Sequence, residues 1–187
     1  AIINNESSGV TLHHILPGVD DGNIIDQEII ELAEDETDET LYKRLIDIGK
    51  RIFDKNVSLI AEASVPEGVL QRVKDSSYYP KGIPFNGTID WTQSASWIER
   101  FIRAFTFSPH PAARTSLAGL SIEILAPVKT DEAKNILSPG SFEQDVLGAL
   151  HVSCGEGILI IDRFMLDSKQ LGTKELMELS RGVSQFQ

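Results

Sequence analysis

The residues of this sequence best placed for chemistry are two adjacent carboxylates in a short turn. Asp20 and Asp21 follow Pro17 and Gly18 and precede Gly22, between two stretches that are rich in aliphatic residues. Such a turn allows a side chain to approach a bound molecule closely, because glycine has no Cβ to hold the backbone away. A carboxylate there can accept a hydrogen bond or a proton. An isolated aspartate beside a glycine is more often a simple turn former, so this site needs further support.

Two histidines, His13 and His14, lie shortly before these carboxylates and raise the question of a metal site. Successive residues of a β-strand point to opposite faces, so only one of the two imidazoles can join a given site. The turn therefore offers at most one imidazole, and we predict that this protein binds no metal.

The net charge of −11 comes from the start of the chain. Residues 1–40 contain eleven Asp and Glu and no Lys or Arg, whereas the remaining 147 residues contain 17 acidic and 17 basic side chains. An acidic surface repels phosphate groups, which argues against nucleic-acid binding by this end of the chain. The acidic stretch is expected to be a solvated loop followed by the start of a helix.

The composition gives no sign of a membrane or secreted protein. No stretch approaches the roughly 20 apolar residues that cross a bilayer, and residues 1–6 lack the features of a signal peptide. Cys154 is the only cysteine, so an internal disulfide is excluded and a reducing compartment fits. We predict a cytoplasmic protein in which Cys154 is a small residue of the core.

The carboxylate turn is expected to join two strands that precede a long helix. Residues 9–15 and 23–32 are rich in β-branched and apolar residues and predict a hairpin or a neighbouring strand pair. A helix is predicted from its N-cap, Thr37, to about residue 63, with acidic residues in its first turn. Its apolar side chains recur every three or four residues, at Leu41, Leu45, Ile48, Ile52 and Phe53.

The second half of the chain predicts a helix and then several short strands. The helix follows Asp90, is ended by the prolines of 108–113, and carries apolar side chains on one face, at Trp97, Ile98, Phe101, Ile102 and Phe105. We interpret this aromatic cluster as core packing. Strands are predicted at 120–126, 149–154 and 158–164, and a last helix at 173–180. Short strands with closely spaced turns indicate a five-stranded, OB-like barrel.

Three groups of motifs follow one another along nearly the whole chain. The first is GVT at 9–11, followed eleven residues after its glycine by the D-x-G-x-I of 20–24. The second is IDW at 89–91, IRAF at 102–105 and P-x-P-x-A at 109–113. The third is CG-x-G-x-L at 154–159 and G-x-K at 172–174. In this order and spacing they resemble the 10-formyltetrahydrofolate-dependent formyltransferases, the family of methionyl-tRNA formyltransferase and the sugar N-formyltransferases.

The resemblance implies an α/β protein with two parts. Residues 1–68 would be the C-terminal part of a Rossmann-like formyltransferase catalytic domain, and residues 69–88 a linker. Residues 89–187 would be a helix followed by the small OB-like β-barrel domain. The implied activity is the transfer of a formyl group from 10-formyltetrahydrofolate to a primary amine, without a metal.

The resemblance also implies functional roles for the residues of the turn. Asp20 corresponds to the family's catalytic aspartate, which assists proton movement as the amine attacks. The backbone of the turn lies where the family binds the pterin ring, so Gly18, Val19, Asp20 and Asp21 are expected to contact the folate.

One family feature does not occur in these residues. The family carries an Asn-x-His pair before this region, beside an S-L-L-P-type loop, and the sequence contains no Asn-x-His. Neither Asn4 and Asn5 nor His13 and His14 lie at the right positions relative to Gly9 and Asp20 to replace it. We therefore expect this sequence to be a fragment of the enzyme that shows no formyl transfer when made alone.

The acceptor amine is less well determined. Residues 78–91 (YYPKGIPFNGTIDW) resemble the linker of sugar N-formyltransferases, which modify an amine on a nucleotide-linked sugar. Residues 120–187 hold ten acidic and six basic side chains, which disfavours a tRNA, although 41–119 hold seven acidic and eleven basic ones. We predict a nucleotide-linked amino sugar, with methionyl-tRNA as the alternative and a hydroxyornithine-type acceptor or a folate hydrolase-like activity after it. A non-catalytic module that binds folate or a nucleotide sugar is the alternative of a different class.

Overall fold

The computed structural model of the protein describes residues 1–72, 79, 82–107, 111–132 and 137–187. The chain divides into two compact units, Glu6–Lys81 with Ala1, and Gly82–Gln187 with Ile2–Asn5. The boundaries expected from the sequence, with a linker over 69–88, stay a prediction. Residues 73–78 and 80–81 of that linker, and 108–110 of the expected helix break, lie outside the described residues.

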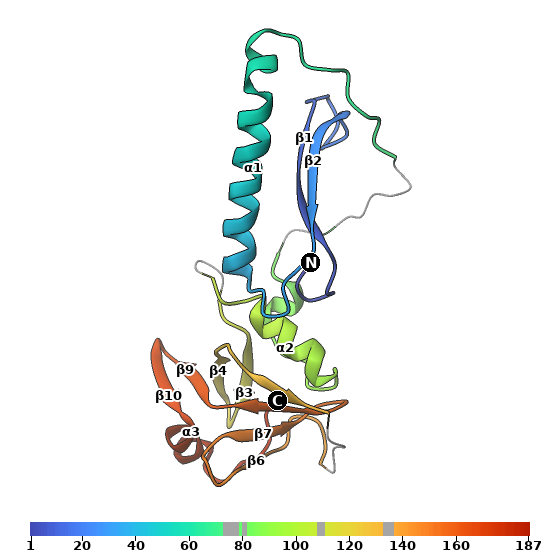
Figure 1. Ribbon diagram of the computed structural model, residues 1–187. Coiled ribbons are helices and arrows are strands. Elements are labelled where there is room, and N and C mark those ends of the chain that lie inside the picture. Colours follow the sequence, from blue (N-terminus) through green and yellow to red (C-terminus); the bar gives the residue numbers. More distant parts are fainter. Residues whose placement is uncertain (73–78, 80–81, 108–110, 133–136) are drawn as a thin grey trace. The chain divides into compact units, whose positions relative to one another are not determined.

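The first unit is a two-stranded hairpin with a long helix beside it (Figure 1). Strands β1 (Ser8–His13) and β2 (Ile24–Ile30) pair antiparallel, with an irregular register between Leu12 and His13. Helix α1 (Asp38–Ala61) packs along both strands and buries the side chains of Leu41, Ile48, Ile52 and Asn56. The predicted hairpin is confirmed. Of the predicted apolar face of the helix, Leu41, Ile48 and Ile52 are buried, whereas the side chain of Phe53 is 51% exposed.

The beginning of α1 follows from its first residues. Thr37 is the N-cap: its Oγ1 accepts a hydrogen bond from Thr40 N at 3.2 Å, and Thr40 Oγ1 accepts one from Thr37 N at 2.9 Å. This reciprocal capping box satisfies backbone donors that the helix cannot pair internally. Asp38 and Glu39 add negative charge in the first turn, next to the positive end of the helix dipole. The predicted N-cap is confirmed, and the helix ends at Ala61, shortly before the predicted end.

The second unit contains two four-stranded sheets in which neighbouring strands run antiparallel. One has the order β10 (Lys169–Gly172), β9 (Arg163–Leu166), β4 (Leu120–Ile124) and β3 (Arg114–Leu117). The other has the order β5 (Lys129–Asp131), β8 (Ile158–Ile161), β7 (Leu150–Ser153) and β6 (Phe142–Gln144). Its helices are the 3₁₀ turn η2 (Pro84–Gly87), α2 (Ala95–Arg103) and α3 (Thr173–Ser180). In the described residues of the chain, no helix is long and apolar enough to cross a membrane.

These strands do not close into a barrel within the described residues, so the predicted five-stranded OB-like barrel is not confirmed. One difference from the predicted strands lies at Asp162. The predicted strand at 158–164 is in fact two strands, because β8 ends at Ile161 and pairs with β7, whereas β9 begins at Arg163 and pairs with β4. The chain changes sheets at this one residue. In the first unit the strand pair is antiparallel, so its Rossmann-like character rests on the sequence resemblance.

The core of the second unit surrounds α2. Ile98, Phe101 and Ile102 of this helix are completely buried. The ring of Trp97 stacks on Phe101 with centroids 5.2 Å apart. Aromatic side chains with these contacts and this burial are packing residues, as the helical spacing predicts.

Candidate active site

Asp20 lies in the connection between β1 and β2. Its backbone φ is +52°, a left-handed conformation that is unfavourable for a residue with a Cβ. Its side chain is 86% exposed, and its Oδ1 lies 3.7 Å from Nε2 of His13, the last residue of β1. The turn therefore presents a carboxylate to solvent with an imidazole beside it.

The ring of His13 is held by its other nitrogen. Nδ1 lies 2.8 Å from the carbonyl oxygen of His14, which can only accept, so Nδ1 carries a proton. In the neutral ring Nε2 then presents a lone pair, and 3.7 Å from Asp20 is too long for a hydrogen bond. Protonation of Nε2 converts this contact into an attractive ion pair. The sequence reasoning placed His13 among possible metal ligands and missed this pairing.

A segment far along the sequence, residues 66–71, lies against the turn, and we call it the strap. Ile24 at the start of β2 and Val69 of the strap exchange both backbone hydrogen bonds at 2.8 Å. Gly68 has a φ of +79°, and a Cβ there would lie 2.6 Å from the carbonyl oxygen of Ile24. Only glycine allows the backbone to approach this closely. The strap is thereby able to pair with the start of β2 as a short extended segment.

Side chains of the turn also reach the strap. His14 Nε2 lies 2.9 Å from the carbonyl oxygen of Pro66, and Asn23 donates from Nδ2 to that of Glu67 at 3.0 Å. In the opposite direction, Gln71 donates from Nε2 to the carbonyl oxygens of Asp20 and Gly22. The sequence gives no sign of these contacts, because a glutamine in a polar segment shows no periodicity and no motif.

The other predicted folate contacts lie in the same turn. Val19 is 92% exposed, so an apolar side chain stands in solvent beside Asp20. The carboxylate of Asp21 folds over Gly18, since a Cβ on Gly18 would lie 1.9 Å from Asp21 Oδ2. Gly22 is buried, and a Cβ there would lie 1.7 Å from the backbone oxygen of His14, which explains the glycine at this position.

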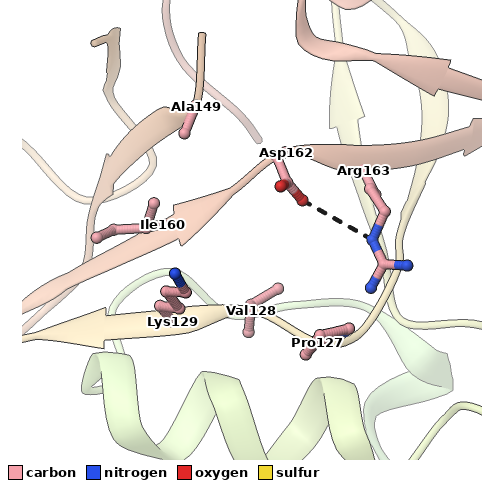
Figure 2. A pocket seen from close by; sticks show the side chains of 7 residues that line it. All are labelled: Pro127, Val128, Lys129, Ala149, Ile160, Asp162 and Arg163. Carbon is pink, nitrogen blue, oxygen red and sulfur yellow. Dashed lines mark ion pairs between the residues drawn. The ribbon is translucent and has the colours of Figure 1, made fainter. Parts of the chain in front are cut away.

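Two cavities lie within the second unit. One, of about 370 Å³, has an apolar floor of Pro127, Val128 and Ile160 and a rim that includes Lys129, Asp162 and Arg163 (Figure 2). Figure 2 shows the Asp162 carboxylate and the Arg163 guanidinium directed toward each other, with Nε and Oδ1 3.8 Å apart. Arg163 also donates to the carbonyl oxygen of Ala126 and lines the second cavity, of about 440 Å³. None of the predicted site residues borders either one.

The remaining candidate groups play other roles. Cys154 is buried, and this burial raises the pKa of its thiol to about 12, so it is a neutral core residue, as predicted. Within the residues that the structure describes, no group of three or more His, Cys, Asp or Glu is placed to hold a metal ion.

Comparison with known proteins gives a consistent set of relatives. Residues 84–180 match the family described as "Formyl transferase, C-terminal domain". The chain is 29% identical over 187 residues to methionyl-tRNA formyltransferase of Hahella chejuensis, covering 99% of this chain and 57% of that protein. It is 39% identical over 114 residues to the bifunctional polymyxin resistance protein ArnA of Wigglesworthia glossinidia brevipalpis, covering 60% of this chain and 17% of that protein. The chain thus spans about half the length of the methionyl-tRNA formyltransferases it matches.

Solved structures point the same way. The N-formyltransferase of Helicobacter canadensis, in complex with folinic acid and dTDP-3-aminofucose, is 29% identical and superposes with a TM-score of 0.63. The match covers 86% of this chain and 57% of that one. HypX of Aquifex aeolicus in complex with tetrahydrofolic acid has a TM-score of 0.68 over 97% of this chain and 32% of that one. Its identity is 17%, so this second likeness concerns the fold alone.

Proposed function

This chain belongs to the formyl transferase family, and on that premise we propose that it takes part in transferring a formyl group from 10-formyltetrahydrofolate to a primary amine. The observation that carries the proposal is the Asp20 turn, an exposed carboxylate paired with His13 at the motif that resembles the family's catalytic aspartate. The proposal includes the finer fold expected from the resemblance, a Rossmann-like catalytic part and an OB-like C-terminal part.

The chemistry of formyl transfer explains the need for a carboxylate. The nitrogen of the acceptor attacks the formyl carbon, and the amine must lose a proton as the tetrahedral intermediate forms. Asp20 is the proposed acceptor of that proton, directly or through a water molecule. His13, whose Nε2 lies 3.7 Å from Asp20 Oδ1, is the proposed partner that balances the charge of the carboxylate when the ring is protonated.

The formyl oxygen becomes negatively charged in the intermediate and needs hydrogen-bond donors. The resemblance assigns this role to an Asn-x-His pair, which does not occur among these 187 residues. We propose that the part of the relatives' length that this chain does not span supplies those donors.

Formyltetrahydrofolate is the proposed donor. Two of the structures similar to this chain contain folinic acid or 5-N-formyl-THF together with nucleotide ligands. In this chain, the backbone of Gly18, Val19 and Asp20 is the proposed contact for the pterin ring, with Asp21 beside it. The exposed Val19 side chain supports this role, because an apolar residue in a polar turn gains when a ring covers it.

A nucleotide-linked amino sugar is the acceptor we favour. Sugar N-formyltransferases are among the similar structures at 28 and 29% identity. The acidic excess in residues 120–187 opposes binding of a polyanion. Methionyl-tRNA is the second candidate, because methionyl-tRNA formyltransferases match 88 to 99% of this chain.

The test is a panel of acceptors. The protein as its gene encodes it is incubated with 10-formyltetrahydrofolate and either dTDP-3-aminofucose or charged initiator methionyl-tRNA, and release of tetrahydrofolate is followed. Turnover with the sugar alone supports our choice, and turnover with the tRNA alone overturns it in favour of the second candidate. Folate binding without turnover of any amine identifies a non-catalytic binding module and refutes the enzyme.

A further inference from the structure

The side-chain amide of Gln71 makes two hydrogen bonds to the backbone of the Asp20 turn. Nε2 lies 2.9 Å from the carbonyl oxygen of Asp20 and 2.6 Å from that of Gly22. Both partners are carbonyl oxygens, which only accept, so the orientation of the amide is fixed by chemistry. The two N–H groups of one amide are thereby used on the two ends of a three-residue turn.

These contacts bear on the carboxylate because little else holds it. The Asp20 side chain is mostly exposed, and the nearby Nε2 of His13 lies 3.7 Å from its Oδ1, beyond hydrogen-bond distance. The direction of the side chain is therefore set mainly by the left-handed backbone at Asp20. A left-handed conformation at a residue with a Cβ persists only where surrounding contacts maintain it.

The rest of the strap brings Gln71 into position. The paired backbones of Ile24 and Val69 anchor the strap two residues before Gln71. At the beginning of the strap, the carbonyl oxygens of Pro66 and Glu67 contact the side chains of His14 and Asn23. Together with these contacts, the hydrogen bonds of Gln71 hold the turn from a segment that is not part of the hairpin.

We propose that Gln71 is a positioning residue for formyl transfer: it holds the Asp20–Gly22 turn and so directs the Asp20 carboxylate toward the reacting amine. This inference rests on the proposed function and adds to it a residue some 50 positions away in sequence. Neither the family match over residues 84–180 nor the predicted site includes it.

The first arm of the test needs no activity. Gln71→Leu keeps a side chain of similar size but removes both donors. The matched control is Gln27→Leu, because Gln27 also donates a hydrogen bond from Nε2, to Thr11 of the same hairpin at 2.7 Å. Amide hydrogen exchange at His14 and Ile24, whose N–H groups are bonded at the turn, should accelerate about tenfold in Gln71→Leu only. Unchanged exchange would overturn the proposal.

The second arm separates positioning from simple support. In the protein as its gene encodes it, Gln71→Leu should lower kcat about 10- to 100-fold with a small change in KM. The loss should largely disappear when Asp20 is already asparagine, because Gln71 acts through Asp20. If Gln71→Leu lowers kcat by the same factor in the Asp20→Asn variant as in the unaltered protein, the positioning role is contradicted. If the unaltered protein shows no formyl transfer, the proposed function fails, and the exchange arm decides alone whether Gln71 holds the turn.

Discussion

The imidazole of His13 and the carboxylate of Asp20 face each other across the turn between β1 and β2, with Nε2 3.7 Å from Oδ1. His13 Nδ1 is hydrogen-bonded to the carbonyl oxygen of His14, so the Nε2 edge of the ring is the one that faces Asp20. The neighbour of the Asp20 carboxylate on this side is therefore the Nε2 edge of the His13 ring.

Replacing His13 with phenylalanine tests this pair. The variant keeps a ring of similar size and loses both nitrogens, so Asp20 loses its neighbouring partner. In the protein as its gene encodes it, we expect kcat for formyl transfer to fall about tenfold or more. The control is His151→Phe, because His151 pairs with a different carboxylate, that of Asp145 in the second unit, at 3.0 Å. Equal effects of the two substitutions would contradict the role of His13.

Cys154 gives a prediction that depends on pH. Its pKa is raised by burial from about 9 to about 12, so the folded protein holds the thiol proton more tightly than the unfolded chain does. Its contribution to stability is therefore complete below about pH 9 and is lost as pH rises toward 12. We expect iodoacetamide to leave Cys154 unmodified in the folded protein at about pH 8.5 and to alkylate it in urea. Rapid alkylation of the folded protein would show that the thiol is accessible.

The core of the second unit depends on a buried polar contact. Trp91 donates from Nε1 to Thr115 Oγ1 at 2.9 Å, and both side chains are buried. Thr115→Val keeps the shape and leaves the indole N–H without its acceptor, so we expect the free energy of unfolding to fall by about 1–3 kcal/mol. The control, Thr11→Val, removes an exposed acceptor of Gln27 and should cost less than about 0.5 kcal/mol. Urea titration measures both, and equal losses would contradict this account.

Local signals account for what the sequence predicts correctly. The capping residues at Thr37 and the apolar face of α1 depend on neighbours within a few positions, and the last helix at 173–180 is found with the predicted bounds. The sheet change at Asp162 has no such signal. A single residue separates β8 from β9, and both strands are too short and too apolar for a pattern to divide them.

The candidate site shows the same limit. The motif at 20–24 indicates Asp20, and the glycines around it indicate the turn. The partner Gln71 lies 51 positions from Asp20 and reaches it through backbone carbonyls, which any residue supplies. Such contacts do not require particular residue types at the turn, so the sequence does not predict them and only the structure identifies the strap.

The rate of formyl transfer by Asp20→Asn tests the central claim most directly. Asparagine keeps the size of the side chain and removes the charge, and the exposed position predicts a change in the free energy of unfolding within about 0.5 kcal/mol. In the protein as its gene encodes it, with 10-formyltetrahydrofolate and dTDP-3-aminofucose, kcat should fall by about 10²- to 10⁴-fold. Asp35→Asn, at an exposed carboxylate elsewhere in the same unit, should retain the rate of the unaltered protein. A near-normal rate in Asp20→Asn would contradict the account.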